Sequence, residues 1–340
     1  MHMSDALLSV AVGTTMNAVS TGAIGYSVTK LKKMDLEDNK IPMMGVMGAF
    51  VFAAQMINFT IPVTGSSGHI GGGILLAALL GPYAAVITLS CVLLIQCLFF
   101  ADGGLLALGC NILNLAVLPC LVAYPLLYKT ILKKKLTKKR ITIASLVAVV
   151  IGLQLGAFGV VLQTLLSGIT ELPFLAFTAV MQPIHLAIGI VEGIITAAVL
   201  CFIYNIRKEI VENALEAGNL HKVSMRRVYV ILASAAIFIG GFLSWYASSN
   251  PDGLEWAIEK VAQETEISNE TAVHEAVQKL QDATAVLPDY SFKEMRSVDE
   301  RLGTSISGIV GGAITLAIAM AFGGLIICYK RYRKRKKSYV

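Results

Sequence analysis

Charged residues are scarce in this sequence. Only 15% of the 340 residues are Asp, Glu, Lys or Arg, whereas 56% are hydrophobic, and the mean hydropathy is +0.71. Soluble domains carry about 25% charged and about 45–50% apolar residues, so the composition excludes a soluble or disordered chain. It indicates a membrane protein, whose length translates into helices of about 20 apolar residues each.

Several motifs are also missing. No Gly-Lys dipeptide occurs, so the chain has no G-x-x-x-x-G-K-[ST] loop for nucleotide phosphates and cannot be an ATPase. No Cys-x-x-Cys pair occurs and all six cysteines fall within apolar runs, which argues against a thiolate metal site or a disulfide framework. His69 is followed by Ile-Gly-Gly-Gly rather than by Glu-x-x-His, which argues against an intramembrane metal hydrolase. The chain is therefore predicted not to be an enzyme.

Apolar runs predict an all-α integral membrane protein with about nine transmembrane helices, arranged as seven plus two. The third run is short and is bounded by a glycine-rich stretch and by Gly81-Pro82, so it either crosses with little tilt or dips in and returns. The predicted spans are residues 5–29, 41–59, 66–81, 83–101, 104–128, 141–167, 183–206, 228–248 and 305–329.

Basic residues predict the orientation in a prokaryotic cell membrane. They cluster at 30–40, 129–140, 207–227 and 330–337, and lysine and arginine accumulate in cytoplasmic loops. Residues 250–303 carry 12 acidic and 5 basic residues and are expected outside. The N-terminus is therefore expected outside and the C-terminus in the cytoplasm. The basic tail directly follows a span, which indicates orientation and contact with anionic lipid rather than nucleic-acid binding.

The chain divides into two predicted membrane modules. Residues 1–206 form the first, 207–227 a charged cytoplasmic linker, and 228–340 a two-helix module around the outer segment 250–303. In that segment Asp252 and Glu255 have capping-box spacing, and a second helix is predicted from an apolar i, i+3, i+4, i+7 stripe: Val273, Ala276, Val277 and Leu280. Both helices are expected to pack on the membrane module or a partner. Gly308 and Gly312 form a G-x-x-x-G pair, which permits close helix packing.

The first two residues form a ready chelate. The α-amino group of Met1 and the backbone nitrogen of His2 close a five-membered ring around a metal, and that nitrogen and Nδ1 of His2 close a six-membered ring. Planar nitrogen coordination favours Ni²⁺, Cu²⁺ or Co²⁺ over Zn²⁺. His69 lies on the same predicted side and could fill the fourth position, although exposed or hydrogen-bonding roles for both histidines explain the residues equally simply. Residues 1–29 lack a basic n-region and are expected to be retained, which leaves Met1 as the terminus.

Four stretches resemble a known family. They are the start MHMSDALLS, GSSGHIGGGILLAALLGPYAAV (65–86), FFADGGLLALGCNILNLAV (99–117) and HLAIGIVEGIITAAV (185–199). Together they resemble the substrate-binding membrane component of energy-coupling-factor nickel/cobalt transporters, the CbiM or NikM family. Residues 251–255 resemble the PDGLE motif of the small accessory component found fused or adjacent in this family.

The resemblance implies a function and a site. The chain would capture nickel or cobalt as transported substrate, without a prosthetic group, and its partners would be a transmembrane coupling subunit and two cytoplasmic ATPase subunits. Met1, His2 and His69 would hold the ion in a square-planar site. The family's usual start is Met-His-Ile-Pro-Asp-Gly, whereas this chain has Met3, Ser4 and Ala6 around Asp5, which leaves the chelating atoms unchanged. A stand-alone, ion-coupled secondary transporter is the alternative.

Other polar residues could support the site. Metal-bound histidines usually donate their second ring nitrogen to an oxygen, and four nearby residues could accept it or serve as caps and turns: Asp5, Asn58, Ser66 and Ser67. His185 and Glu192 are seven apart, hence on one helix face, and could guide the ion or tie helices together. Asp102, Asn111 and Asn114 are expected to serve packing, and His221 and His274 to be solvated.

Overall fold

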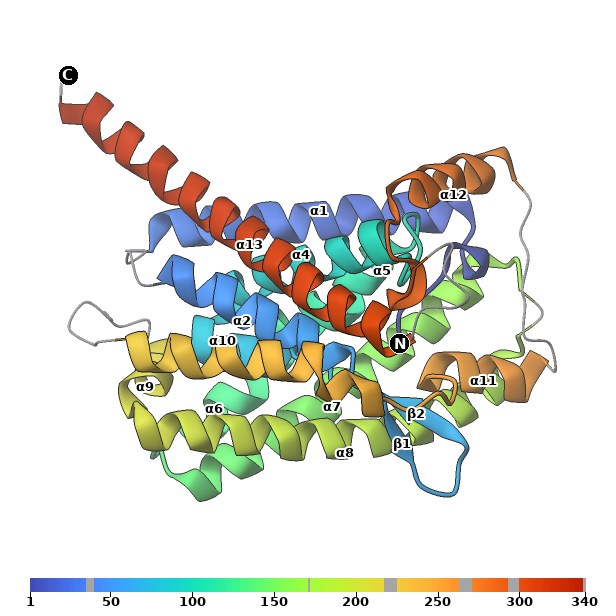
Figure 1. Ribbon diagram of the computed structural model, residues 1–340, viewed down its shortest axis with the longest axis horizontal. Helices are drawn as coiled ribbons and strands as arrows, with labels where there is room; N and C mark the ends of the chain where they lie inside the picture. The colour runs from blue at the N-terminus through green and yellow to red at the C-terminus, as the bar shows by residue number, and fades with distance from the viewer. Residues whose placement is uncertain (35–39, 171, 217–224, 263–270, 293–299, 339–340) are drawn as a thin grey trace.

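The computed structural model describes residues 1–34, 40–170, 172–216, 225–262, 271–292 and 300–338. Most described residues are helical, and the long helices run roughly along one direction, with the N-terminus at one end of the bundle and the C-terminus at the other (Figure 1). Helices that precede the outer segment are η1 (Asp5–Leu7), α1 (Val10–Lys33), α2 (Lys40–Gln55), α3 (Gly73–Leu80), α4 (Pro82–Phe100), α5 (Leu108–Ile112), η2 (Leu113–Tyr128), α6 (Lys129–Leu132), α7 (Lys138–Ser167), α8 (Phe174–Ile206), α9 (Lys208–Glu216), α10 (Arg226–Gly241) and η3 (Leu243–Tyr246).

Five helical stretches are long and apolar enough to cross a membrane: Pro82–Phe100, Leu108–Leu132, Lys138–Ser167, Phe174–Ile206 and Arg301–Lys330. Of the other predicted spans, α2 and α10 have 16 residues each, and α1 has 24 but is less apolar. The predicted helical membrane protein is confirmed. The count of nine spans and the orientation stay predictions.

The short third run, residues 66–81, does not form one continuous helix. Strand β2 (Ser66–Gly68) pairs antiparallel with β1 (Phe59–Ile61), and α3 has only eight residues, about 12 Å at 1.5 Å per residue. Three consecutive glycines precede the body of α3, and Gly72 has φ +78°, a left-handed conformation that a helix cannot continue through. The segment nevertheless runs lengthwise, because His69 lies beside Met1 and Gly81 lies near Lys40 at the far end of α2.

The predicted span 104–128 begins later and is wound more loosely than expected. Residues 101–107 form a loop in which Ala101 and Gly103 have positive φ, and α5 begins at Leu108. The following stretch η2 is a π-helix that contains Pro119 and Pro125, which lack the amide hydrogens that helical bonding needs. The loop before α5 is thereby left at the end of the bundle that holds the N-terminus.

The last helix ties the second module to the first. Helix α13 (Glu300–Ser338) packs along α2 and α10, and the backbones of Gly308 and Gly240 touch where α13 crosses α10. Gly312, the second member of the predicted pair, is less crowded: a Cβ at this position would lie 3.9 Å from the Cβ of Ala49. In the linker, α9 packs on α8 and α3, with Ile210 and Val211 fully buried, and residues 217–224, His221 included, lie outside the described residues.

The outer segment covers the N-terminal end of the bundle. Its elements are α11 (Gly253–Ala262), α12 (Ala272–Thr284) and η4 (Pro288–Tyr290), and residues 263–270 and 293–299 lie outside the described residues. The chain before α11 extends the β1–β2 hairpin, since Ser67 forms a parallel bridge with Asp252 and its amide donates to Pro251 O at 2.8 Å. The capping box of α11 is confirmed: Asp252 Oδ1 accepts from the amide of Glu255 at 2.9 Å, and Glu255 Oε2 accepts from that of Asp252 at 3.0 Å.

Helix α12 forms where predicted but buries a different face. Val273 and Leu280 of the predicted apolar stripe are exposed, whereas His274 and Gln281 are buried. His274 Nε2 lies 2.9 Å from Leu8 O, and Gln281 donates to Gly103 O at 2.7 Å. The expectation of a solvated His274 is wrong because these side chains satisfy carbonyl groups that would otherwise be buried unpaired.

Candidate metal centre

The N-terminal segment is threaded into the bundle rather than left free. Met1 and Met3 are buried, and Asn111 of α5 clamps the backbone of Met3: its Oδ1 accepts from the Met3 amide at 2.8 Å, and its Nδ2 donates to the Met3 carbonyl at 3.2 Å. The amide of Gly104 donates to the same carbonyl at 2.9 Å. These bonds fix the terminus although the chain lacks the Pro and Gly of the usual family start.

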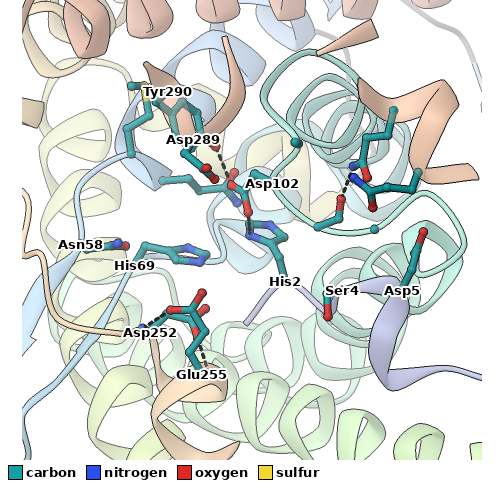
Figure 2. Close-up of a pocket in the computed structure, with 17 residues that line it drawn as sticks. His2, Ser4, Asp5, Asn58, His69, Asp102, Asp252, Glu255, Asp289 and Tyr290 are labelled. Carbon is teal, nitrogen blue, oxygen red and sulfur yellow. Dashed lines mark hydrogen bonds and ion pairs between the residues drawn. The ribbon is translucent and has the colours of Figure 1, made fainter. Parts of the chain in front are cut away.

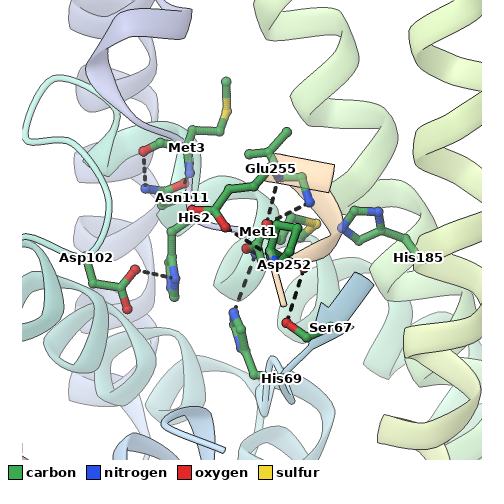
Figure 3. A network of polar contacts seen from close by, with 12 residues as sticks. Met1, His2, Met3, Ser67, His69, Asp102, Asn111, His185, Asp252 and Glu255 are labelled. Atoms are coloured by element: carbon green, nitrogen blue, oxygen red, sulfur yellow. Dashed lines mark hydrogen bonds and ion pairs between the residues drawn. The ribbon is translucent and has the colours of Figure 1, made fainter. Parts of the chain in front are cut away.

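The amino group of Met1 faces two side chains from distant parts of the chain. It lies 3.5 Å from Nε2 of His69 and pairs closely with Oδ2 of Asp252 (Figure 3). Nδ1 of His69 lies 3.0 Å from the Ile70 carbonyl, which requires a proton on Nδ1 and leaves the Nε2 lone pair directed at the amine. Two of the predicted ligand atoms are therefore adjacent.

His2 completes the cluster with its ring. The rings of His2 and His69 stack with their centroids 5.1 Å apart and an angle of 11° between their planes. Nδ1 of His2 lies 2.9 Å from Oδ1 of Asp102, and its buried Nε2 has no hydrogen-bond partner among the described residues. In this orientation Nδ1 points to Asp102, so the predicted six-membered chelate requires the ring to turn about its Cβ–Cγ bond.

Asp102 is held by a second contact. Tyr290 of η4 donates from its hydroxyl to Oδ2 of Asp102 at 2.5 Å (Figure 2). Burial opposes ionisation of Asp102, but the charge of His2 and hydrogen bonds from His2 and Tyr290 outweigh it, so the pKa of this carboxyl lies below its usual range. A carboxylate that orients a ligand imidazole is a common arrangement around metals.

Asp252 carries two roles with its two oxygens. Oδ1 caps α11 and Oδ2 pairs with the Met1 amine. Burial again raises the pKa, but the adjacent ammonium lowers it more, so the pKa of Asp252 lies below its usual range. The helix cap alone explains the pattern of residues 252–255, so the sequence gives no sign of the second role.

The four residues expected to orient the ligands lie close to the site but contact other groups. Asp5 is buried and accepts from the Ala107 amide at 2.8 Å, which fixes the loop before α5. Ser66 and Ser67 direct their hydroxyls at the chain before α11, with Ser67 donating to Asn250 O at 2.8 Å. Asn58 lines the cavity above the site. Other residues contact the N-terminal segment instead. Asp252 pairs with Met1, Asp102 with His2, and Asn111 with Met3. Tyr290 holds Asp102.

His185 and Glu192 lie on the inner side of the cluster. His185 lines a small cavity together with Met1 and His69, and Glu192 accepts from the Gly72 amide at 2.9 Å. Both side chains are buried. Glu192 thus holds the glycine turn that follows His69.

A cavity of about 420 Å³ opens above the site and is rich in carboxylates (Figure 2). Five carboxylates line it, Asp5, Asp102, Asp252, Glu255 and Asp289, and among the described residues no Lys or Arg does. Burial and the neighbouring Asp252 raise the pKa of Glu255. Among the described residues no three His, Cys, Asp or Glu side chains converge as a metal site by themselves.

The helices and their apolar composition define a multi-pass membrane protein. Residues 2–210 match the family described as "Cobalt uptake substrate-specific transmembrane region" (CbiM), and residues 226–327 match the "PDGLE domain". The chain belongs to the CbiM family and carries a PDGLE domain in the same polypeptide. The resemblance seen in the sequence is confirmed.

Two of the relatives have names that describe a fused nickel transport protein. The "Putative fused nickel transport protein NikMN" of Archaeoglobus fulgidus is 31% identical over 94% of this chain and 97% of its own length. The "Probable fused nickel transport protein LarMN" of Lactiplantibacillus plantarum is 35% identical over 59% of each chain. A solved structure titled "Crystal Structure of an Truncated Transition metal Transporter" is 30% identical with a TM-score of 0.53, covering 60% of this chain and 99% of that one.

Proposed function

We propose that this chain is the substrate-capture component of an ATP-driven importer for nickel or cobalt ions. The observation that carries the proposal is the convergence of the Met1 amine and His69 Nε2 at 3.5 Å, with His2 stacked on His69. Nitrogen donors from an amine, a backbone amide and two imidazoles suit planar Ni²⁺ and tetragonal Co²⁺. The names of the relatives support nickel as cargo, and the description of the matching family supports cobalt.

The ion would replace contacts that the described groups make with one another. The Met1 ammonium and the His2 amide would each release a proton to solvent on binding, and the freed amine would leave Asp252 and turn its lone pair to the ion. Nε2 of His69 would turn its lone pair to the ion as well. A half-turn of the His2 ring exchanges the places of Nδ1 and Cδ2, so that Nδ1 faces the chelate. The same turn exchanges Nε2 with Cε1 and keeps a ring nitrogen on the side of Asp102, which would then hold the ligand ring in place.

Energy for uptake would come from partner subunits. This sequence contains no phosphate-binding loop. The surface of α1 favours contact with another protein within the membrane. Its outward face carries small residues such as Ala18, Gly22 and Gly25, and nothing in the described chain lies within 4 Å of a Cβ built at either glycine. Small residues allow close helix contact. We propose a transmembrane coupling subunit and two cytoplasmic ATPases as the partners, with a stand-alone secondary carrier as the alternative.

Metal binding tests the capture role. Purified full-length chain is expected to bind one Ni²⁺ or Co²⁺ in equilibrium dialysis, with visible absorption of nitrogen-ligated metal. His69→Ala should weaken binding about a hundredfold because one of four donors is lost. His69→Phe keeps a ring that can stack on His2 but has no nitrogen, and it should bind as weakly as His69→Ala. Binding by His69→Phe equal to that of the native chain would show that His69 packs and does not ligate.

Transport distinguishes the two mechanisms. In liposomes that contain this chain alone, no ion accumulation is expected under a proton or sodium gradient. Accumulation without any ATPase would support the secondary carrier and reject the proposed coupling.

The carboxylates of the cavity are expected to speed the association of Ni²⁺ with the site. Carboxylates that line a cavity concentrate cations at low ionic strength, and the Debye length is about 10 Å at 0.1 M salt. Glu255→Gln combined with Asp289→Asn should slow Ni²⁺ association about threefold to tenfold at low salt, leave dissociation nearly unchanged, and have little effect at high salt. The side-chain amide oxygen that Glu255→Gln introduces can still accept from the Asp252 amide, so the cap of α11 is preserved.

The control removes the same charge elsewhere in the outer segment. Glu275→Gln with Asp282→Asn alters two exposed carboxylates of α12 and should leave association unchanged. Stopped-flow measurement of both double variants decides the question. Equal slowing by both pairs would assign the effect to overall charge, and no slowing by either would remove the steering role of the cavity.

A further inference from the structure

One buried imidazole beneath the metal centre has no partner for its second nitrogen. His185 of α8 is 1% exposed, and its Nδ1 lies 2.9 Å from the Met181 carbonyl one turn earlier. That contact requires a proton on Nδ1, so Nε2 carries a lone pair, and this nitrogen is buried without a hydrogen-bond partner in the described structure. Buried ring nitrogens are normally paired, so an unpaired one indicates a group that is missing from its surroundings.

His185 faces the same small space as the proposed ligands. A cavity of about 10 Å³, close to the volume that holds one water-sized particle, is lined by His185, Met1, His69 and the glycines Gly68, Gly71 and Gly253. Figure 3 shows the His185 ring pointing from α8 toward Met1 and Asp252. The cavity therefore connects the outer cluster with the membrane-facing helix.

Glycines keep this space open. A Cβ at Gly253 would lie 3.1 Å from Cε1 and 3.3 Å from Nε2 of His185, and a Cβ at Gly68 would lie 2.6 Å from Ile188 on the same helix. Two loops from different modules thus approach α8 closely because they lack side chains there. Glu192 lies two turns further along the same face of α8, where it accepts from Gly72.

We propose that His185 is an inner ligand on the path of the ion, taking Ni²⁺ or Co²⁺ on Nε2 when His69 leaves it. The inference rests on the proposed function. The step is an exchange of one neutral imidazole for another: the bond from the ion to His69 Nε2 breaks, that to His185 Nε2 forms, and no proton moves because Nδ1 of His185 already carries one. An imidazole suits both ions, and the exchange from His69 to His185 moves the ion one step inward.

The first test reads coordination directly in the full-length chain with its native terminus. His69→Ala removes the outer imidazole, and His185→Cys in that background offers a thiolate at the inner position. One equivalent of Ni²⁺ should produce a thiolate-to-nickel charge-transfer band in the near ultraviolet. His69→Ala with Thr196→Cys is the matched control, since Thr196 is buried on the same helix three turns away, and it should show no band.

Each outcome of this test decides the inference. No band in the His185→Cys chain, whether Ni²⁺ is bound without it or not bound at all, overturns the inner-ligand role. Failure of the native chain to bind Ni²⁺ would instead overturn the proposed function, so the two failures are distinguishable.

The second test compares the effect of one substitution on transport with its effect on binding. His185→Leu leaves the outer donors intact and should keep the Kd for Ni²⁺ within about threefold of the native value, whereas uptake by the assembled transporter should fall at least tenfold. Thr196→Val, the matched control, should change neither. Unchanged uptake in folded His185→Leu, or equal loss of binding and uptake, would overturn the inference.

Discussion

A chain extended by two glycines before Met1 is expected to bind Ni²⁺ at least about a thousand-fold more weakly than the native chain. The extension leaves every side chain in place but converts the Met1 nitrogen into a peptide nitrogen. It thereby removes the donor that lies 3.5 Å from His69 and the ammonium that pairs with Asp252. Equilibrium dialysis and visible absorption of purified protein measure the loss.

The number of added residues matters for this experiment. A single glycine would make His2 the third residue, and an amine, two amides and a third-position imidazole form a planar nitrogen chelate by themselves. Two glycines avoid that arrangement. Two glycines after Val340 are the matched control and should leave binding unchanged. Equal binding by the N-terminally extended chain, with the same visible spectrum, would show that the terminal amine is no ligand.

Gly308→Leu is expected to lower the stability of the folded chain by about 3 kcal/mol and to separate α13 from α10. A Cβ at Gly308 would lie 2.3 Å from the Gly240 carbonyl oxygen and 2.6 Å from its Cα, distances that backbone atoms cannot relieve without the helices moving apart. Thermal unfolding in detergent and limited proteolysis should show the change.

Gly324→Leu provides the matched control on the same helix. Apart from the helix's own backbone, no atom of the described residues lies within 4 Å of a Cβ placed at Gly324, so the same substitution adds a side chain in open space and should leave the melting temperature nearly unchanged. If both variants melted alike, the loss would come from glycine replacement in a helix and not from the crossing at Gly240.

Much of the architecture follows from the sequence because long apolar runs have few alternatives in a membrane. The same logic left the path of residues 66–81 open, where hydropathy is high but three glycines and a left-handed turn at Gly72 break the helix. It failed for α12, whose apolar stripe is exposed while His274 and Gln281 bind backbone carbonyls. Hydropathy does not report which buried carbonyls need a donor.

The proximity of Met1, His2 and His69 was predicted from chelate chemistry and the family resemblance, and the described geometry places these three residues together. Asp252 and Asp102 were not assigned to the site. Asp252 was already accounted for as a helix cap, and a second use of its other oxygen leaves no trace in local spacing. Asp102 depends on Tyr290, 188 residues away, and such a pairing is fixed only by the fold.

The contact between Met1 and Asp252 also sets an order during synthesis. These residues are 251 positions apart, and chains grow at about 5–20 residues per second, so the terminal amine waits about 10–50 s for its carboxylate. The two groups of this contact are thus made far apart in time. A chain that stops before Asp252 leaves the Met1 amine without this counter-charge, so the contact requires that synthesis has passed from the CbiM region into the PDGLE region.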